Sequence, residues 1–160
     1  MLCYYEFVKD IIIRKIEKDE AIPWSLLELA DPSLEKVKAY VESGDLYVAL
    51  IDDHIVGEYV LMRTSEKVAE IMNVAVDPAW QGKGIGKRLV LDAIERAKDK
   101  GVVRVEIGTG NSSIGQIELY KKCGFTITGI EKGYFLKNYP DPIYENGVRC
   151  EDMVRMALTL

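Results

Sequence analysis

Apolar and polar positions along this chain follow two different periods, which divide it into expected strands and helices. Runs rich in β-branched residues predict strands within residues 11–16, 46–64, 68–78, 102–108, 125–131 and 150–160. The run 46–64 is interrupted by Asp52 and Asp53, which predicts a hairpin of two strands. Pro78 is expected to end the strand that precedes it.

Four other stretches carry apolar residues at helical spacing. One helix is predicted from about Trp24, and a second between the cap signal at 31–33 and Gly44. The second has a predicted apolar face of Leu34, Val37, Tyr40 and Val41. The third, from Gly86 to Lys100, has an apolar face of Leu89, Val90, Ala93, Ile94 and Ala97. The fourth lies within 111–125, where Ser113 and Gln116 match a capping box. Residues 132–147 are predicted to be a loop.

This order of elements mixes antiparallel hairpins with helical crossovers, which predicts an α+β fold with helices on the faces of a sheet. The chain has 160 residues, 48% of them hydrophobic, and five prolines. This size suits one compact domain. We therefore expect a single domain over residues 1–160, with a core from about residue 11 to residue 160.

Charge and cysteine content narrow the class of protein. A net charge of −5 argues against a nucleic-acid or anionic-membrane surface. The three cysteines, Cys3, Cys123 and Cys150, and the one histidine, His54, lack the spacing of a metal site or a disulfide framework. The N-terminal stretch does not resemble a signal peptide, and no apolar run is long enough to span a membrane. A reduced, metal-free cytoplasmic protein is expected.

The stretch VDPAWQGKGIGKRLV, residues 76–90, contains three glycines and three cations within 82–88. It fits neither the dinucleotide fingerprint nor the P-loop, because the required glycines and hydroxyl are absent. The pattern Gln81-x-x-Gly84-x-Gly86 lies between an expected strand and an expected helix, where free backbone N–H groups can hold a pyrophosphate. The alternative is a glycine-rich turn with solvated cations.

These residues resemble the GNAT superfamily of acetyl-CoA-dependent N-acetyltransferases. Gln81, Gly84 and Gly86 match its acetyl-CoA signature, and Leu119, Tyr120, Gly124 and Phe125 match the end of its second hallmark helix. The resemblance covers about residues 11–160 and implies a GNAT-type, largely antiparallel twisted sheet with helices on both faces. It also implies that acetyl-CoA is the co-substrate.

The resemblance further implies a set of coenzyme-binding residues. Backbone N–H groups of the strand segment Val74, Ala75 and Val76 would hold the thioester carbonyl and the pantetheine. The loop made of Gln81, Gly82, Lys83, Gly84, Ile85, Gly86 and Lys87 would surround the pyrophosphate. Many family members have an asparagine seven residues before the helix tyrosine, where this chain has Ser113, while Asn111 lies nine before. Either residue could meet the pantetheine.

Two residues are candidates for proton transfer. The Tyr120 phenol is protonated near neutral pH and could donate to the departing thiolate, although a core tyrosine would have the same pattern. Glu70 matches a family glutamate that acts as general base, although a carboxylate at a strand start is commonly solvated. Cys123 could suggest an acetyl-enzyme, but no His or Asp lies in the same segment to activate it. We expect Cys123 to be a buried spectator and His54 a solvated turn residue.

The acceptor is expected between the first helices and the late loop. That region offers aromatic side chains, Trp24, Tyr134, Tyr139 and Tyr144, and carboxylates, Glu28, Asp31, Asp141 and Glu145. They suit a small amine, although these residues could also simply pack and solvate the domain edge. Peptide N-termini or lysines, and a non-catalytic acyl-CoA-binding module, are the alternatives. A homodimer is left open.

Overall fold

The computed structural model of the protein describes residues 10–160. Predictions that concern the first nine residues, among them that for Cys3 and that for the absence of a signal peptide, lie outside the described residues. Within residues 10–160, no helix combines the length and the apolar character that a membrane span needs.

The described residues contain a seven-stranded mixed sheet in the order β1-β2-β3-β4-β5-β9-β6. Its strands are β1 (Ile12–Lys15), β2 (Asp45–Ile51), β3 (His54–Arg63), β4 (Val68–Val76), β5 (Arg104–Gly110), β6 (Thr126–Glu131) and β9 (Met153–Thr159). Neighbours are antiparallel except β4 and β5, which are parallel. The predicted α+β class with a largely antiparallel sheet is confirmed.

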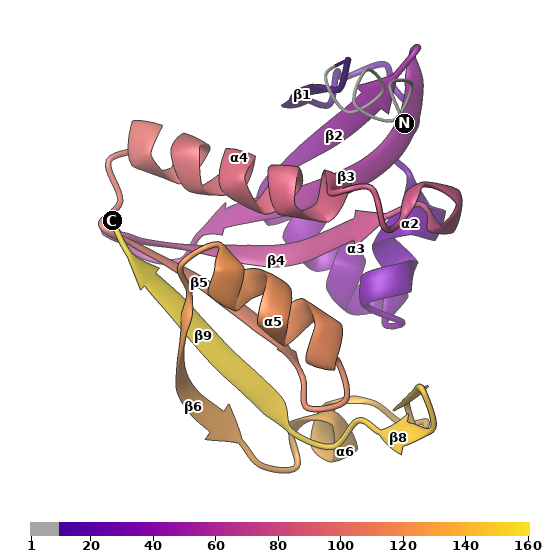
Figure 1. Ribbon diagram of the computed structural model, residues 1–160, viewed down its shortest axis with the longest axis vertical. Coiled ribbons are helices and arrows are strands. Elements are labelled where there is room, and N and C mark those ends of the chain that lie inside the picture. The colour runs from indigo at the N-terminus through magenta and orange to yellow at the C-terminus, as the bar shows by residue number, and fades with distance from the viewer. Residues whose placement is uncertain (1–9) are drawn as a thin grey trace.

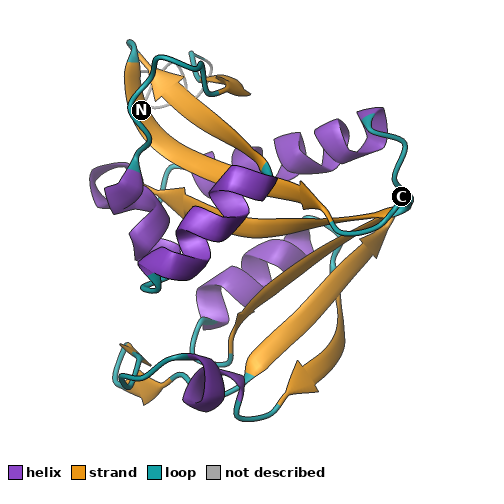
Figure 2. Ribbon diagram, turned by 180° about the vertical axis from the view of Figure 1, so that it is seen from behind, coloured by secondary structure: helices purple, strands orange, loops and turns teal. Residues whose placement is uncertain are grey.

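Helices cover both faces of this sheet. The helices α4 (Ile85–Asp99) and α5 (Ile114–Lys122) lie on the face seen in Figure 1. The helices α2 (Trp24–Ala30) and α3 (Leu34–Ser43) lie on the opposite face, which Figure 2 shows from behind. This arrangement follows the sequence, because each helix has an apolar face that it must bury.

Two hydrophobic cores result, one on each face. The predicted face of α4, from Leu89 to Ala97, is buried against the sheet as expected. On the other face, Leu27, Val37 and Tyr40 pack with Leu46 and Val60. The predicted face of α3 was wrong at Leu34, which is 39% exposed because it begins the first turn of the helix, at the edge of this second core.

The strands β4 and β5 separate toward their C-terminal ends. They pair from Val68 with Arg104 as far as Ile71 with Ile107, and the ladder between them stops there. Figure 1 shows the two strands meeting near the C-terminus of the chain and diverging away from it. The backbone of β4 beyond Ile71 therefore faces an open space on that side.

The predicted loop at 132–147 was wrong in part. It contains the short helix α6 (Tyr134–Asn138) and the strand β7 (Tyr144–Glu145), which forms a hairpin with β8 (Val148–Arg149). The helix is held by tertiary contacts, since the N–H of Gly133 donates to Asp152 Oδ1 and that of Phe135 to the carbonyl of Glu151. A five-residue helix that depends on such contacts shows no hydrophobic periodicity in the sequence, so it was not predicted.

Two further local predictions differ from the structure. The capping box at α5 is absent, because Ser113 makes no side-chain cap and its hydroxyl donates to Glu145 instead. A 3₁₀ turn, η1 (Pro78–Trp80), was not predicted; it follows Asp77, whose side chain accepts from the N–H of Ala79.

Candidate active site

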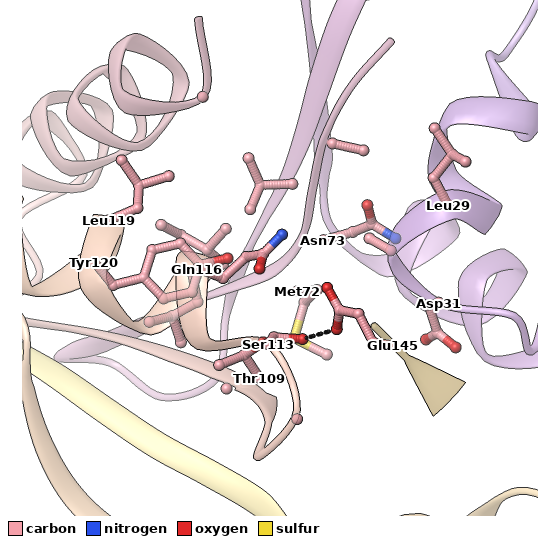
Figure 3. A pocket seen from close by; sticks show the side chains of 18 of the residues that line it. Leu29, Asp31, Met72, Asn73, Thr109, Ser113, Gln116, Leu119, Tyr120 and Glu145 are labelled. Carbon is pink, nitrogen blue, oxygen red and sulfur yellow. Dashed lines mark hydrogen bonds between the residues drawn. The ribbon is translucent and has the colours of Figure 1, made fainter. Parts of the chain in front are cut away.

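A cleft of about 1130 Å³ opens where β4 and β5 diverge. Its walls come from β4, the end of β5, the loop before α4, α5, the end of α2, α3, the segment from α6 to β7, and β9. Figure 3 shows one wall formed by Leu119, Tyr120 and Gln116 of α5, and the facing wall formed by Leu29 and Asp31 at the end of α2. Segments distant in sequence therefore share one concave site.

Most predicted site residues line this cleft. They are Glu70, Val74, Ala75, Val76, Gln81, Gly82, Gly84, Ile85, Gly86, Lys87, Ser113 and Tyr120 on the expected coenzyme and reaction side, and Asp31, Tyr134, Tyr139, Tyr144 and Glu145 on the expected acceptor side. The lining does not include Trp24, Glu28, Lys83, Asn111 or Asp141.

The open edge of β4 presents backbone donors to the cleft. The N–H of Asp77 donates to the carbonyl of Val56 on β3, at 2.8 Å. Because backbone groups alternate in direction along a strand, the N–H groups of Val76 and Val74 point the other way, toward the gap beside β5. The direction implied by the family resemblance thus agrees with the geometry of this strand.

The loop before α4 exposes backbone to the same cleft. Gly82 and Gly84 have φ values of 76° and 81°, and a Cβ on either would meet no atom within 4 Å. Gly84 caps α4, whose first helical hydrogen bond is donated by Arg88, at 3.2 Å. The three N–H groups before it lie at the positive end of a 15-residue helix. The loop therefore fits a pyrophosphate.

The side chain of Gln81 fixes this loop to the strand. Its Nε2 donates to the carbonyl of Val76 at 3.0 Å. The signature glutamine thereby ties the turn to the open edge of β4. This contact leaves the Val76 N–H directed into the cleft.

Tyr120 lies on the α5 wall and is 4% exposed. Burial, with smaller contributions from Cys123, Glu145 and Glu58, raises its pKa above the ordinary tyrosine value. The phenol is therefore neutral at working pH and can donate a proton. Figure 3 shows its ring beside Gln116 in the cleft.

Ser113 and Asn111 take different positions. Ser113 lines the cleft, and its hydroxyl donates to Glu145 of β7 (Figure 3). The Asn111 side chain accepts the N–H groups of Glu151 and Asp152, at 2.8 and 3.0 Å. Asn111 thus holds the chain just before β9 and does not line the cleft.

Glu70 lies in β4, opposite Met62 of β3 and Glu106 of β5. Its side chain is 20% exposed, and Arg155 lies 3.7 Å from it. Burial raises its pKa, Arg155 opposes this rise, and the nearby carboxylates of Glu106 and Glu131 add to it. A carboxylate with a raised pKa on a cleft wall can accept a proton near neutral pH.

Cys123 and His54 do not form a nucleophilic pair. Cys123 is buried, and burial raises the pKa of its thiol, which disfavours the reactive thiolate. His54 begins β3 and is exposed. Within residues 10–160, no group of three or more His, Cys, Asp and Glu side chains is arranged to hold a metal ion.

The acceptor side is organised around Asp31. Its Oδ1 accepts the Tyr139 hydroxyl at 2.8 Å and the Ser33 N–H at 3.0 Å, and its Oδ2 accepts the Tyr40 hydroxyl at 3.1 Å. The Tyr40 oxygen in turn accepts Nδ2 of the buried Asn73, at 2.8 Å. One carboxylate thus joins α2, α3 and α6 at the cleft wall.

Sequence reasoning missed Tyr40, Asn73 and Arg155 as cleft residues. Asn73 could have been noticed, because it is a polar residue in the centre of the apolar strand 68–78. Tyr40 follows the helical period and is indistinguishable from a core residue. Arg155 occupies an alternating polar position in β9, a pattern that is typical of a solvated strand face.

Comparisons with known proteins agree with this geometry. Residues 12–125 match the family described as Acetyltransferase (GNAT) family. The chain is 52% identical over 137 residues to "Uncharacterized N-acetyltransferase YvbK" of Bacillus subtilis (strain 168), covering 86% of this chain and 88% of that protein.

Two solved structures are similar over nearly the whole chain. A GNAT family acetyltransferase from Elizabethkingia anophelis with acetyl-CoA bound has 46% identity and a TM-score of 0.92, covering 94% of this chain and 99% of that one. A Bacillus subtilis acetyltransferase in complex with CoA has 49% identity and a TM-score of 0.89, with the same coverage.

The fold, the cleft and these matches define an acyltransferase of the GNAT type. The chain belongs to the GNAT acetyltransferase family, and it is an N-acetyltransferase. The alternative of a non-catalytic acyl-CoA-binding module is therefore set aside.

Proposed function

We propose that this enzyme transfers the acetyl group of acetyl-CoA to a primary amine of a small molecule, directly and within a ternary complex. The observation that carries the proposal is the continuity of the cleft. It extends from the loop before α4, past the open edge of β4 and Tyr120, to the wall around Asp31. Both substrates can therefore meet without an intermediate carrier.

The coenzyme would bind along the first half of this path. The N–H groups at the start of α4, with the Lys87 ammonium, would hold the pyrophosphate. The N–H groups of Val74 and Val76 would hold the pantetheine and the thioester carbonyl, and Ser113 is a better candidate for the pantetheine than Asn111. Lys83, which is outside the lining, would contribute attraction over a longer range.

The reaction needs one base and one acid. The amine nitrogen attacks the thioester carbon, the carbon–sulfur bond breaks, and one proton leaves the nitrogen while one joins the departing sulfur. Glu70 would accept the first proton, directly or through water, and Tyr120 would supply the second. The raised pKa of Glu70 suits a base, and the raised pKa of Tyr120 keeps its phenol protonated until the thiolate departs.

Direct transfer is favoured over an acetyl-enzyme. The one nucleophile that the sequence offered near Tyr120 is Cys123, which is buried and whose pKa is raised. A thiol in that state is a poor nucleophile. We expect Cys123→Ser to retain most of the wild-type turnover.

The far end of the cleft supports a small amine as acceptor. Asp31 and Glu145 bring negative charge to its walls, and the rings of Tyr134, Tyr139 and Phe135 add apolar surface. An ammonium group with a short carbon skeleton matches both features. We also propose that the protein acts in the cytoplasm and has no metal or nucleic-acid partner, while a homodimer stays open.

A turnover screen tests the proposal. Acetyl-CoA would be supplied with panels of polyamines, aminoglycoside-like compounds, amino acid derivatives and peptides, with CoA release and product mass as readouts. Acetylation of a small amine is the expected result. Acetylation restricted to peptide N-termini or lysines would contradict the small-molecule acceptor and leave the family unchanged.

A further inference from the structure

An arginine from β9 crosses a neighbouring strand to reach Glu70. Arg155 lies opposite Gly108 of β5, and β5 lies between β9 and β4 in the sheet. Its Nη1 is 3.7 Å from Glu70 Oε2, and its Nε is 2.7 Å from Glu131 Oε1. The guanidinium therefore lies between the carboxylates of Glu70 on β4 and Glu131 on β6, the strands on either side of the pair β5 and β9.

The absence of a side chain at Gly108 makes this crossing possible. A Cβ at Gly108 would lie 3.1 Å from Arg155 Nη1 and 2.7 Å from Met153 Sδ. The Met153 sulfur would have to move, and the Arg155 guanidinium would have to give by a few tenths of an ångström, so a branched side chain at this position would crowd the path of the arginine. On the other side of Arg155, a Cβ at Gly129 of β6 would meet no atom within 4 Å.

The charged groups nearest to Glu70 are two carboxylates and Arg155, and one of these carboxylates, Glu106, also pairs with Arg104 at 3.1 Å. Glu106 faces it from β5, Glu131 approaches from β6, and the Tyr134 hydroxyl lies nearby on α6. Its partner on β3, Met62, is uncharged. Partial burial and two like charges all favour a proton on Glu70, and the Arg155 guanidinium opposes them.

We propose that Arg155, admitted across the strand by Gly108, is the positioning residue that keeps Glu70 ionised and directed at the cleft. The proposal rests on the proposed function, because it takes Glu70 as the base that receives the amine proton. The interaction between Arg155 and Glu70 can nevertheless be tested separately from catalysis, because it exists in the free enzyme. A base that already holds a proton cannot accept another, so the guanidinium would extend activity to lower pH.

The coupling can be measured without an acceptor. Carboxyl-carbon NMR would follow a pH titration of protein carrying isotope-labelled glutamate, with the Glu70 signal assigned by its loss in Glu70→Gln. We expect Arg155→Gln to move the Glu70 midpoint upward by roughly one pH unit. Arg155→Lys should recover part of the shift, because it keeps the charge and loses the planar guanidinium.

Gly108→Val tests the crossing itself, because its branched side chain crowds the path of Arg155 and changes no charge. It should also raise the Glu70 midpoint. Gly129→Val is its matched control on the other neighbour of Arg155, and Lys121→Gln, on the exposed side of α5, controls for the loss of one positive charge. Both controls should leave the midpoint unchanged.

An unchanged Glu70 midpoint in Gly108→Val and Arg155→Gln, with the controls behaving as expected, would overturn the proposal. If Arg155→Gln does not fold, Arg155→Lys and Gly108→Val decide the outcome. A different measurement tests whether Glu70 is the base: if it is not, the pH–rate profile of Glu70→Gln will overlay that of the wild type. The two ideas can therefore fail independently.

Discussion

Tyr120 has the position and the protonation state that a proton donor to a thiolate needs. It lies on the cleft wall, and burial raises its pKa, which keeps the phenol protonated at working pH but makes it a weaker acid. We expect Tyr120→Phe to lower kcat by roughly 10- to 1,000-fold, because proton transfer is lost while the ring still fills its space. The acetyl-CoA Kd, measured by calorimetry, should stay nearly constant. A normal kcat would assign Tyr120 to packing alone.

Glu70 should control the acid limb of the pH–rate profile. A base works when ionised, so activity falls as pH drops through its pKa, which partial burial raises. Glu70→Gln should remove this limb and lower activity near neutrality. Activity should recover partly at alkaline pH, where a primary amine with a pKa of about 10.4 is increasingly neutral. The check is kcat/KM measured from pH 6 to pH 10 on an acceptor found by the screen, with exposed Glu95→Gln as the control.

At the scale of elements, α4 and the turn before it form the proposed binding site for the pyrophosphate. Gly84→Glu would add bulk and negative charge beside the first N–H groups of the helix. We expect acetyl-CoA to bind roughly 10- to 100-fold more weakly by calorimetry. Gly101→Glu is a matched control at the opposite end of α4, since Gly101 also has a positive φ, of 79°, and open space. Equal affinities in the two variants would remove the pyrophosphate from this loop.

The elements also explain how far sequence reasoning reached. The apolar face of α4 and the turn from Gln81 to Gly86 were predictable, because hydrophobic periodicity and the glycines of a turn are visible in a short stretch of sequence. The hairpin of β7 and β8 had a local sequence signal as well, because the dipeptide Asn146-Gly147 is typical of a type I′ turn. Both residues have the positive φ that this turn requires. Asp31 joined to Tyr139, 108 residues away, and Arg155 crossing Gly108, are products of topology. No local pattern encodes them.

At the scale of the whole molecule, the seven-stranded sheet buries one carboxyl group without a partner. Glu58 of β3 is 0% exposed, and neither carboxylate oxygen has a hydrogen-bond partner among the described residues. Burial raises its pKa well above the usual glutamate value. The folded protein therefore keeps this proton over a pH range in which the unfolded chain, with a pKa of about 4.3, releases it.

This difference makes global stability depend on pH in a defined direction. The contribution of neutral Glu58 is complete below the unfolded pKa and is lost as pH rises toward the folded pKa. Glu58→Gln has no proton to release, so it should exceed the wild type by roughly 1–3 kcal/mol at pH 8 and lose that advantage toward pH 4. Urea unfolding at both pH values measures this, and exposed Glu95→Gln, on the outer side of α4, should follow the wild type. If residues 1–160 form a single domain, each curve will have one cooperative transition. A Glu58→Gln advantage of the same size at both pH values would mean that Glu58 does not change its ionisation on folding.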